Sequence, residues 1–172
     1  MFKHILVPLD GSALAESALS AALTIANAFH SEVTLLHVVL PPFTLAKLST
    51  PDFAELLVII REEMRREAEA YLQSKQAALQ TESEQIHCHI ALGDSAASAI
   101  LDAADVLGVD AIVMSTHGRS GIRRWVLGSV ADKVLQQATI PIVLMRTPSA
   151  ADVYPLPIPA IESLEDMRSH EE

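Results

Sequence analysis

The segment FKHILVPLDGS, residues 2–12, combines a strand, a turn and the start of a helix. Its first eight residues are mostly apolar, which predicts a buried β-strand. Ser12 then has the side chain of a good helix N-cap. From Ser12 to Phe29, apolar residues recur at the i, i+3 and i+4 spacing of one helix face. The members of that face are Ala15, Ala18, Leu19, Ala22, Ala26 and Phe29.

Apolar strands and amphipathic helices go on alternating through the rest of the chain. Residues 32–39, EVTLLHVV, are rich in β-branched residues and predict a second strand. Thr50, Pro51 and Asp52 supply the cap, the proline and the acidic residue typical of a helix start, and this helix is expected to run to about Gln80. The remaining expected elements are a strand over 85–92, a helix that Asp94 caps and Gly108 ends, a strand over 110–115, a short helix over 130–138 and a strand from Pro141.

This order, β-α-β-α-β-α-β-α-β, is typical of a parallel sheet covered by helices on both faces. With right-handed crossovers it predicts an open, doubly wound, five-stranded α/β fold. The strand over 85–92 alternates apolar and polar residues, so we expect it at a less buried place such as a sheet edge. Cys88 falls on its apolar face and is expected to pack inward. His87 and His89 share the other face, where an exposed surface and part of a metal site are the two interpretations.

The amino-acid composition indicates in which compartment the protein works and which classes of partner it does not bind. A chain of 172 residues suits one domain, and a net charge of −10 argues against general affinity for nucleic acid. No apolar run approaches the ~20 residues of a membrane helix. The single cysteine fits a reducing compartment. We therefore expect a cytoplasmic protein that contacts neither nucleic acid nor membrane.

The last 26 residues differ from the rest of the chain. Residues 147–172 contain six acidic residues against one basic residue, Arg168, and so supply −5 of the net −10. Four prolines favour an extended first half, and apolar residues among them can anchor it. The prolines are Pro148, Pro155, Pro157 and Pro159, and the anchors are Val153, Tyr154, Leu156, Ile158 and Ile161. We expect a domain over 1–146 and an acidic, proline-rich tail that docks on its own domain or on a partner chain.

Two segments are expected to form a ligand site. In doubly wound sheets, ligands bind at the carboxyl ends of the strands, where the winding reverses. Residues 8–12, PLDGS, follow the first strand, and residues 115–130, STHGRSGIRRWVLGSV, follow the fourth. If the winding reverses between these two strands, the carboxylate of Asp10 can accept hydrogen bonds from ribose hydroxyls while the second segment holds phosphate.

The second segment has the composition of a phosphate-binding loop, although it matches neither the P-loop nor the G-x-G-x-x-G pattern. Glycines let the main chain approach a phosphate closely. Gly128-Ser129 opens a helix whose first N–H groups favour an anion. Arg119, Arg123 and Arg124 make the loop basic in an acidic protein. The alternative interpretation is that the glycines turn the chain and Ser129 caps the helix.

Two other side chains of this loop have two interpretations each. Trp125 covers a bound nucleotide or packs the loop onto the helices. His117 polarises a phosphate or makes a structural hydrogen bond. Since no second base or nucleophile is evident beside it, we assign no catalytic residue.

Together these segments resemble the universal stress protein family in its nucleotide-binding form. The family's ATP-binding pattern is glycine, two residues, glycine, nine residues, and then Gly-Ser or Gly-Thr. Here Gly118, nine residues and Gly128-Ser129 match this pattern, and Ser115 stands in place of the first glycine. The stretches HILVPLDGS, LLHVV and PIVLMR and the pair Gly93-Asp94 also resemble the family. The resemblance covers about residues 1–146.

The resemblance implies a fold like that of the adenine-nucleotide α hydrolases, with sheet order 3-2-1-4-5. It also implies a homodimer through the last strand, residues 141–146, and a ligand that is ATP, AMP or ADP with Mg²⁺ or Mn²⁺. Carried over by position, Asp10 would meet the ribose or adenine beside Pro8 and Leu9, Val38 would pair with adenine through its backbone, and Met114 would lie near the sugar. The residues assigned to the phosphate side are Ser115, His117, Gly118, Arg119, Ser120, Gly121, Gly128, Ser129 and Val130.

The leading functional interpretation is a cytoplasmic sensor or regulator that binds ATP and reports on stress or energy state. A slow ATPase, or a phosphoryl- or adenylyl-transfer enzyme on the same fold, is the second. The S-G-G-x-D-S and H-I-G-H motifs of such enzymes are missing here. The third is an interaction module that binds no nucleotide, against which the glycines argue.

Overall fold

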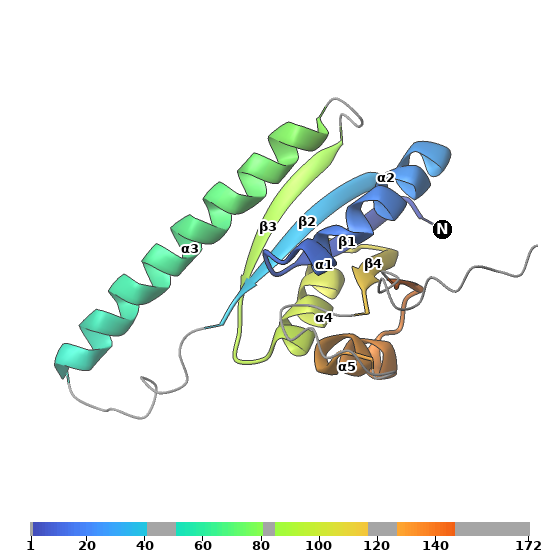
Figure 1. Ribbon diagram of the computed structural model, residues 1–172. Coiled ribbons are helices and arrows are strands. Elements are labelled where there is room, and N and C mark those ends of the chain that lie inside the picture. The colour runs from blue at the N-terminus through green and yellow to red at the C-terminus, as the bar shows by residue number, and fades with distance from the viewer. Residues whose placement is uncertain (1, 41–50, 81–84, 117–126, 147–172) are drawn as a thin grey trace, which may run out of the picture.

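The computed structural model describes residues 2–40, 51–80, 85–116 and 127–146, with the backbone alone for 51–55. Five parallel strands form one sheet in the order β3-β2-β1-β4-β5 (Figure 1), which confirms the expected fold class and strand order. The strands are β1 (His4–Leu9), β2 (Glu32–Val39), β3 (Ile86–Leu92), β4 (Ala111–Ser115) and β5 (Ile142–Met145). The helices are α1 (Ala13–Glu16), α2 (Ala18–Phe29), α3 (Pro51–Leu79), α4 (Ala96–Leu107) and α5 (Ser129–Gln137).

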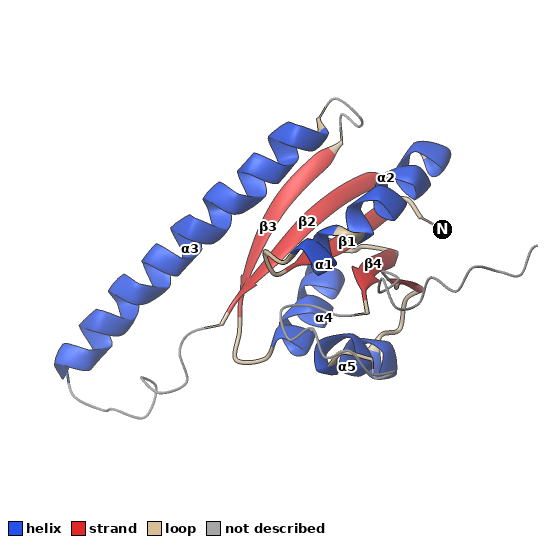
Figure 2. Ribbon diagram, in the orientation of Figure 1, coloured by secondary structure: helices blue, strands red, loops and turns tan. Residues whose placement is uncertain are grey.

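The helices form two layers, one on each face of the sheet (Figure 2). The first core joins the sheet to α1, α2 and α3, and the second joins it to α4 and α5. Strand β1 lies at the centre, and its side chains alternate between the two cores: Ile5 and Val7 enter the first, and Leu6 enters the second. All three are fully buried. Because β2 and β3 extend to one side of β1 while β4 and β5 extend to the other, the winding reverses between β1 and β4.

Most helix boundaries follow the sequence signals. The Ser12 hydroxyl accepts the N–H of Ala15 at 3.1 Å as the N-cap of α1. The expected helix from Ser12 to Phe29 is divided at Ser17, whose hydroxyl donates to the Leu14 carbonyl at 2.6 Å. Such a local side-chain bond competes with regular helix geometry.

The two ends of α4 give one confirmation and one correction. Gly108 ends the helix at φ 64°, in the left-handed region that glycine tolerates. The prediction that Asp94 caps α4 is wrong. Ser95 occupies the N-cap position with extended backbone (φ −137°, ψ 126°), so the helix begins one residue later than the sequence indicated.

Strand β3 lies at the edge of the sheet, as its alternating pattern predicted. Ile86 is buried in the core that α3 covers. The prediction that Cys88 packs inward is wrong, because Cys88 is exposed. An edge strand has a neighbouring strand on one side only, so the helix above it does not cover its whole face.

A polar cluster fastens α3 to α1. Glu16 accepts a hydrogen bond from the Tyr71 hydroxyl at 2.9 Å and one from Lys75 Nζ at 2.7 Å. The hydrogen bond from Lys75 holds the pKa of Glu16 below its ordinary value. Burial, with the hydrogen bond to Glu16, raises the pKa of Tyr71. The charged carboxylate and the neutral phenol therefore join two helices that are far apart in the sequence.

We expect Glu16→Gln to lower the free energy of unfolding by about 1 kcal/mol near neutral pH, because the variant lacks the charge that Lys75 bonds. The Lys75 and Glu16 side chains are only 30% and 26% exposed, so solvent screens this pair incompletely. Since the pKa of Glu16 is lower in the folded than in the unfolded protein, the contribution is full above the ordinary carboxyl range of about 4 and is lost as the pH falls through the folded pKa. Urea unfolding across this pH range should show the two stabilities converging in acid.

Glu62→Gln is the matched control on the same helix. Glu62 pairs with Arg65 at 3.1 Å, but both side chains are close to half exposed. Exposed pairs contribute little, so we expect no measurable change in stability. If the deficit of Glu16→Gln stayed constant from neutral to acidic pH, the charge of Glu16 would not be its source.

Candidate functional site

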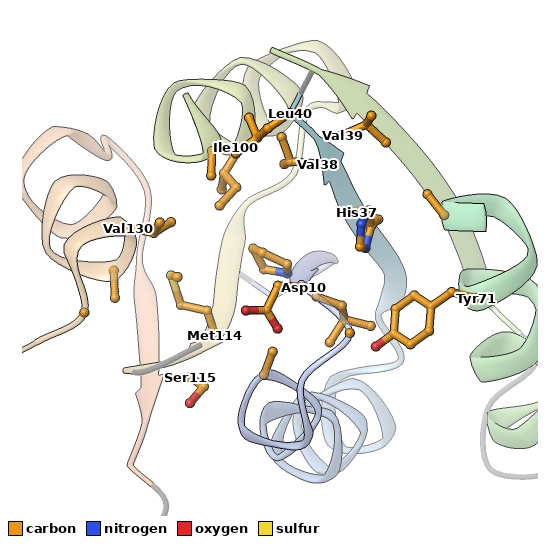
Figure 3. Close-up of a pocket in the computed structure, with 18 of the residues that line it drawn as sticks. Asp10, His37, Val38, Val39, Leu40, Tyr71, Ile100, Met114, Ser115 and Val130 are labelled. Carbon is orange, nitrogen blue, oxygen red and sulfur yellow. The ribbon is translucent and has the colours of Figure 1, made fainter. Parts of the chain in front are cut away.

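A cavity of about 640 Å³ lies at the carboxyl ends of β1, β2 and β4. It is placed where the winding of the sheet reverses, which is where doubly wound sheets bind ligands. Residues of α3, α4 and α5 complete its walls. Figure 3 shows side chains from several of these elements around one space. A volume of this size is typical of small-molecule and cofactor sites.

The structure brings the described part of the sequence-predicted site together. Nine of the predicted residues line this one cavity: Pro8, Leu9, Asp10, Val38, Met114, Ser115, Gly128, Ser129 and Val130. The other five lie outside the described residues, and they are His117, Gly118, Arg119, Ser120 and Gly121. Trp125 lies outside them as well.

The carboxylate of Asp10 lines the cavity and is held by the turn that follows β1 (Figure 3). Its Oδ1 accepts the Ser12 N–H at 2.9 Å and the Ser12 hydroxyl at 2.6 Å. Gly11, between them, has φ 84°, a conformation that side chains disfavour, so glycine is needed at this turn. The turn therefore fixes the direction of the carboxylate before any ligand is present.

The beginning of α5 forms another part of the wall. The Gly128 N–H donates to the Thr116 carbonyl at 2.8 Å, and the Gly128 carbonyl accepts the Asp132 N–H at 2.8 Å as the first bond of the helix. The N–H groups of the first turn have no acceptor within the helix, and they carry the positive end of its dipole. This turn presents Ser129 and Val130 to the cavity. It is suited to an anion, as the Gly128-Ser129 pair predicted.

Apolar side chains line much of the cavity. Val38 lies near the end of β2, Ile100 belongs to α4, and Met114 lies near the end of β4 (Figure 3). Ile100 and Met114 are almost completely buried. The cavity thus combines a carboxylate, apolar side chains and the N-terminal turn of a helix.

The sequence interpretation missed the wall that α3 supplies. Met64, Glu67, Ala68 and Tyr71 line the cavity from this helix. Tyr71 also packs edge-on against the ring of His37, with centroids 5.7 Å apart and planes at 68°. The i, i+4 and i+7 spacing of Met64, Ala68 and Tyr71 shows that they share one helix face. It does not show what that face contacts, because this depends on where α3 packs.

The described residues were also compared with the requirements of a metal site and of a membrane-spanning helix. Within residues 2–40, 51–80, 85–116 and 127–146, no group of three or more His, Cys, Asp or Glu residues could hold a metal ion. His87 and His89 are therefore part of no such group among the described residues. None of the described helices is long and apolar enough to cross a lipid bilayer.

Comparison with known proteins identifies the relatives of this chain. Universal stress protein MJ0531 of Methanocaldococcus jannaschii is 32% identical over 149 residues, which are 86% of this chain and 84% of that protein. The solved structure of MJ0577 from the same organism has a TM-score of 0.76 at 25% identity and covers 87% of this chain and 99% of that one. A universal stress protein solved in complex with cAMP shares the fold at 20% identity, with a TM-score of 0.63 and coverage of 85% and 98%.

A sequence model of a whole protein family also matches this chain. The model of the universal stress protein family matches residues 1–146, from the start of the chain to the residue after β5. The match includes every strand and helix described above, together with the cavity at the β1–β4 reversal. This chain belongs to the universal stress protein family.

Proposed function

We propose that the chain binds ATP in the cavity at the β1–β4 reversal and acts as a cytoplasmic sensor or regulator in the stress response. The observation that carries the proposal is the cavity itself: the fixed carboxylate of Asp10 and the first turn of α5 line one space of about 640 Å³. Apolar side chains, among them Val38, Ile100 and Met114, line the same space. This is the arrangement that a nucleotide needs.

Each part of the nucleotide has a partner of suitable chemistry. The Asp10 carboxylate accepts hydrogen bonds from the ribose hydroxyls, beside Pro8 and Leu9. The backbone of Val38 pairs with adenine, and Met114 contacts the sugar. The first N–H groups of α5 and the Ser129 hydroxyl bind phosphate, together with Ser115 and the segment His117–Gly121. AMP and ADP contain the same base and sugar, so we expect them to bind more weakly than ATP, with fewer phosphate contacts.

A divalent cation, Mg²⁺ or Mn²⁺, would enter with the triphosphate. Magnesium sites of this kind use one or two carboxylates and keep several waters and phosphate oxygens as ligands. Asp10 and Glu67 are the acidic residues among the described lining of the cavity. These two carboxylates are enough for a cation that takes its other ligands from water and phosphate, but they do not form a metal site made of protein ligands alone.

The sequence favours a sensor over an enzyme, because the motifs of the related hydrolases and nucleotidyl transferases are missing. A slow ATPase is the alternative that uses the same bound state. Incubation with labelled ATP separates them, since a sensor returns the nucleotide unhydrolysed.

We expect Ser129→Ala to weaken ATP binding by about tenfold or more and to leave adenosine binding nearly unchanged, because a hydrogen bond to a charged group contributes about 1.5–3 kcal/mol. The N-cap of α5 is Gly128 and not Ser129, so the helix start should survive the change. Asp10→Asn should weaken ATP and adenosine alike. Isothermal titration calorimetry of each variant with ATP, adenosine and inorganic triphosphate measures these changes in affinity.

Asp10→Asn is preferred to Asp10→Ala because the amide oxygen can still accept the two hydrogen bonds from Ser12 and so preserve the turn. Inorganic triphosphate should bind the unmodified protein and Asp10→Asn equally well. If Asp10→Asn lost triphosphate binding but kept adenosine binding, Asp10 would act on the phosphate side and the proposed orientation of the nucleotide would be wrong.

We also propose that the chain forms a homodimer through β5. The carbonyls of Pro141 and Met145 accept N–H groups of the β4 side at 3.0 and 2.9 Å. Since the backbone groups of successive residues in a strand point to opposite sides, those of Ile142 and Leu144 point to the open edge. An apolar edge strand of this kind invites pairing. Antiparallel pairing with a second copy would satisfy its backbone groups across a two-fold axis.

We expect Leu144→Pro to convert the dimer to a monomer, because proline lacks the N–H that points to the partner strand. Leu144→Ala is the control: it removes more of the apolar side chain than proline does but keeps that N–H, so the dimer should persist. Analytical ultracentrifugation at micromolar concentration distinguishes the two forms. A monomer for the unmodified chain under these conditions would rule out the proposed dimer.

A further inference from the structure

The segment that holds the Asp10 carboxylate has little support of its own. Helix α1, which follows the turn, has only four residues, and Ala15 is its one buried residue. Helices of this length are not stable without contacts to the rest of the protein. Gly11, within the turn, is exposed and has φ 84°. The direction of the Asp10 carboxylate therefore depends on contacts between this segment and other elements.

A series of hydrogen bonds connects this segment to Tyr71 of α3. The Ser12 N–H and hydroxyl donate to Asp10 Oδ1 at 2.9 and 2.6 Å. The Glu16 N–H donates to the Ser12 carbonyl at 3.1 Å. The carboxylate of Glu16 accepts the Tyr71 hydroxyl at 2.9 Å. These bonds lead from the Asp10 carboxylate through α1 to a residue of another helix.

A second and more direct contact joins Tyr71 to the turn. The backbone N–H of Gly11 donates a hydrogen bond to the Tyr71 hydroxyl oxygen. A phenol has one proton to donate and two lone pairs that accept. Since the carboxylate of Glu16 can only accept, the proton of Tyr71 is used in the bond to Glu16, and its oxygen is the acceptor for Gly11. One hydroxyl group therefore contacts both ends of segment 11–16.

The aromatic ring of Tyr71 is itself held in place. The His37 ring contacts it edge-on, with the two centroids 5.7 Å apart, and Lys75 Nζ lies 5.7 Å from the Tyr71 centroid. Tyr71 also packs against the first core, and it lines the same cavity as Asp10 (Figure 3). The hydroxyl thus reaches the turn from a side chain whose position is set by β2 and α3.

Direct contact with a ligand would be a different role for this side chain, because Tyr71 lines the cavity. The hydroxyl, however, is already used by the protein. Its proton is donated to Glu16, and one of its lone pairs accepts the Gly11 N–H. These bonds favour support of the turn over binding of the ligand.

We propose that Tyr71 is a positioning residue of the nucleotide site, whose hydroxyl fastens segment 11–16 to α3 and so keeps the Asp10 carboxylate directed into the cavity. Tyr71 acts through Asp10 and not by contact with the nucleoside. The support of the turn is a property of the protein without ligand. Its consequence for nucleoside affinity rests on the proposed function.

Amide hydrogen exchange, measured by NMR, tests the support of the turn without ligand. Tyr71→Phe removes the hydroxyl and keeps the ring. Lys75→Met is the matched control, because it removes a different side-chain hydrogen bond to Glu16 and leaves the Tyr71 hydroxyl in place. We expect the Ser12 N–H, which Asp10 accepts, to exchange about tenfold faster in Tyr71→Phe than in Lys75→Met.

A reference amide shows whether the change is local. The Ile112 N–H donates to the Pro141 carbonyl at 3.0 Å within the sheet, and it should exchange at similar rates in both variants. Equal rates for the Ser12 N–H in the two variants would overturn the proposal. So would an equal acceleration at Ile112 and Ser12 in Tyr71→Phe, because the whole domain would then be loosened.

Calorimetric titration tests the consequence for the site. Tyr71→Phe should bind adenosine about threefold to tenfold more weakly than Lys75→Met does, and should bind inorganic triphosphate with unchanged affinity. In the background of Asp10→Asn, which lacks the carboxylate, Tyr71→Phe should cause little further loss, because residues that act through one group are not additive. If the two losses added in full, Tyr71 would contact the nucleoside itself and the proposal would be wrong.

The two measurements distinguish the role of Tyr71 from the proposed function. If the Ser12 N–H exchanges faster in Tyr71→Phe and the unmodified protein binds no adenosine, the proposed function fails and the support of the turn stands. If the unmodified protein binds adenosine and Tyr71→Phe binds it as tightly as Lys75→Met, the proposed function stands and Tyr71 does not position Asp10.

Discussion

Burial of β1 on both faces is the constraint on which the rest of this structure depends. Ile5, Leu6 and Val7 are consecutive and fully buried, so each face of the central strand needs its own helix layer. Parallel strands can satisfy this only through helical crossovers, and right-handed crossovers place α2 and α3 on one face and α4 and α5 on the other. The chain must then reverse its winding between β1 and β4. The cavity at that reversal is therefore a consequence of how the core is packed.

The cavity owes its chemistry to the ends of the elements around it. Where β1 ends, a glycine turn fixes the Asp10 carboxylate through two hydrogen bonds from Ser12. Where α5 begins, the N–H groups of the first turn have no acceptor within the helix and provide positive potential. Negative and positive ends separated by apolar side chains favour a ligand with hydroxyls at one end and an anion at the other. Neither end needs to rearrange to receive it, which lowers the entropic cost of binding.

Helix α3 connects the packing of the sheet to the cavity. The Glu16–Tyr71–Lys75 cluster ties its later half to α1, and Tyr71 also helps to form the cavity wall. The earlier half extends past the carboxyl ends of β2 and β3 (Figure 1), and there Leu56, Val58 and Ile59 are exposed. One helix therefore serves both the core and the site.

The sequence by itself determined the fold class, and its local patterns singled out Asp10 and Gly128-Ser129, because periodicity, glycine turns and helix starts depend on neighbours in the chain. The strand order and other lining residues such as Val38 and Met114 came from the family resemblance. The sequence did not determine the exposure of Cys88, the division of the first helix at Ser17, or the α3 wall with His37 and Tyr71. Those depend on which surfaces meet after the chain has folded. The sequence shows that a helix face is apolar. It does not show which surface that face packs against, because the answer depends on elements distant in the sequence, and only the tertiary structure decides it.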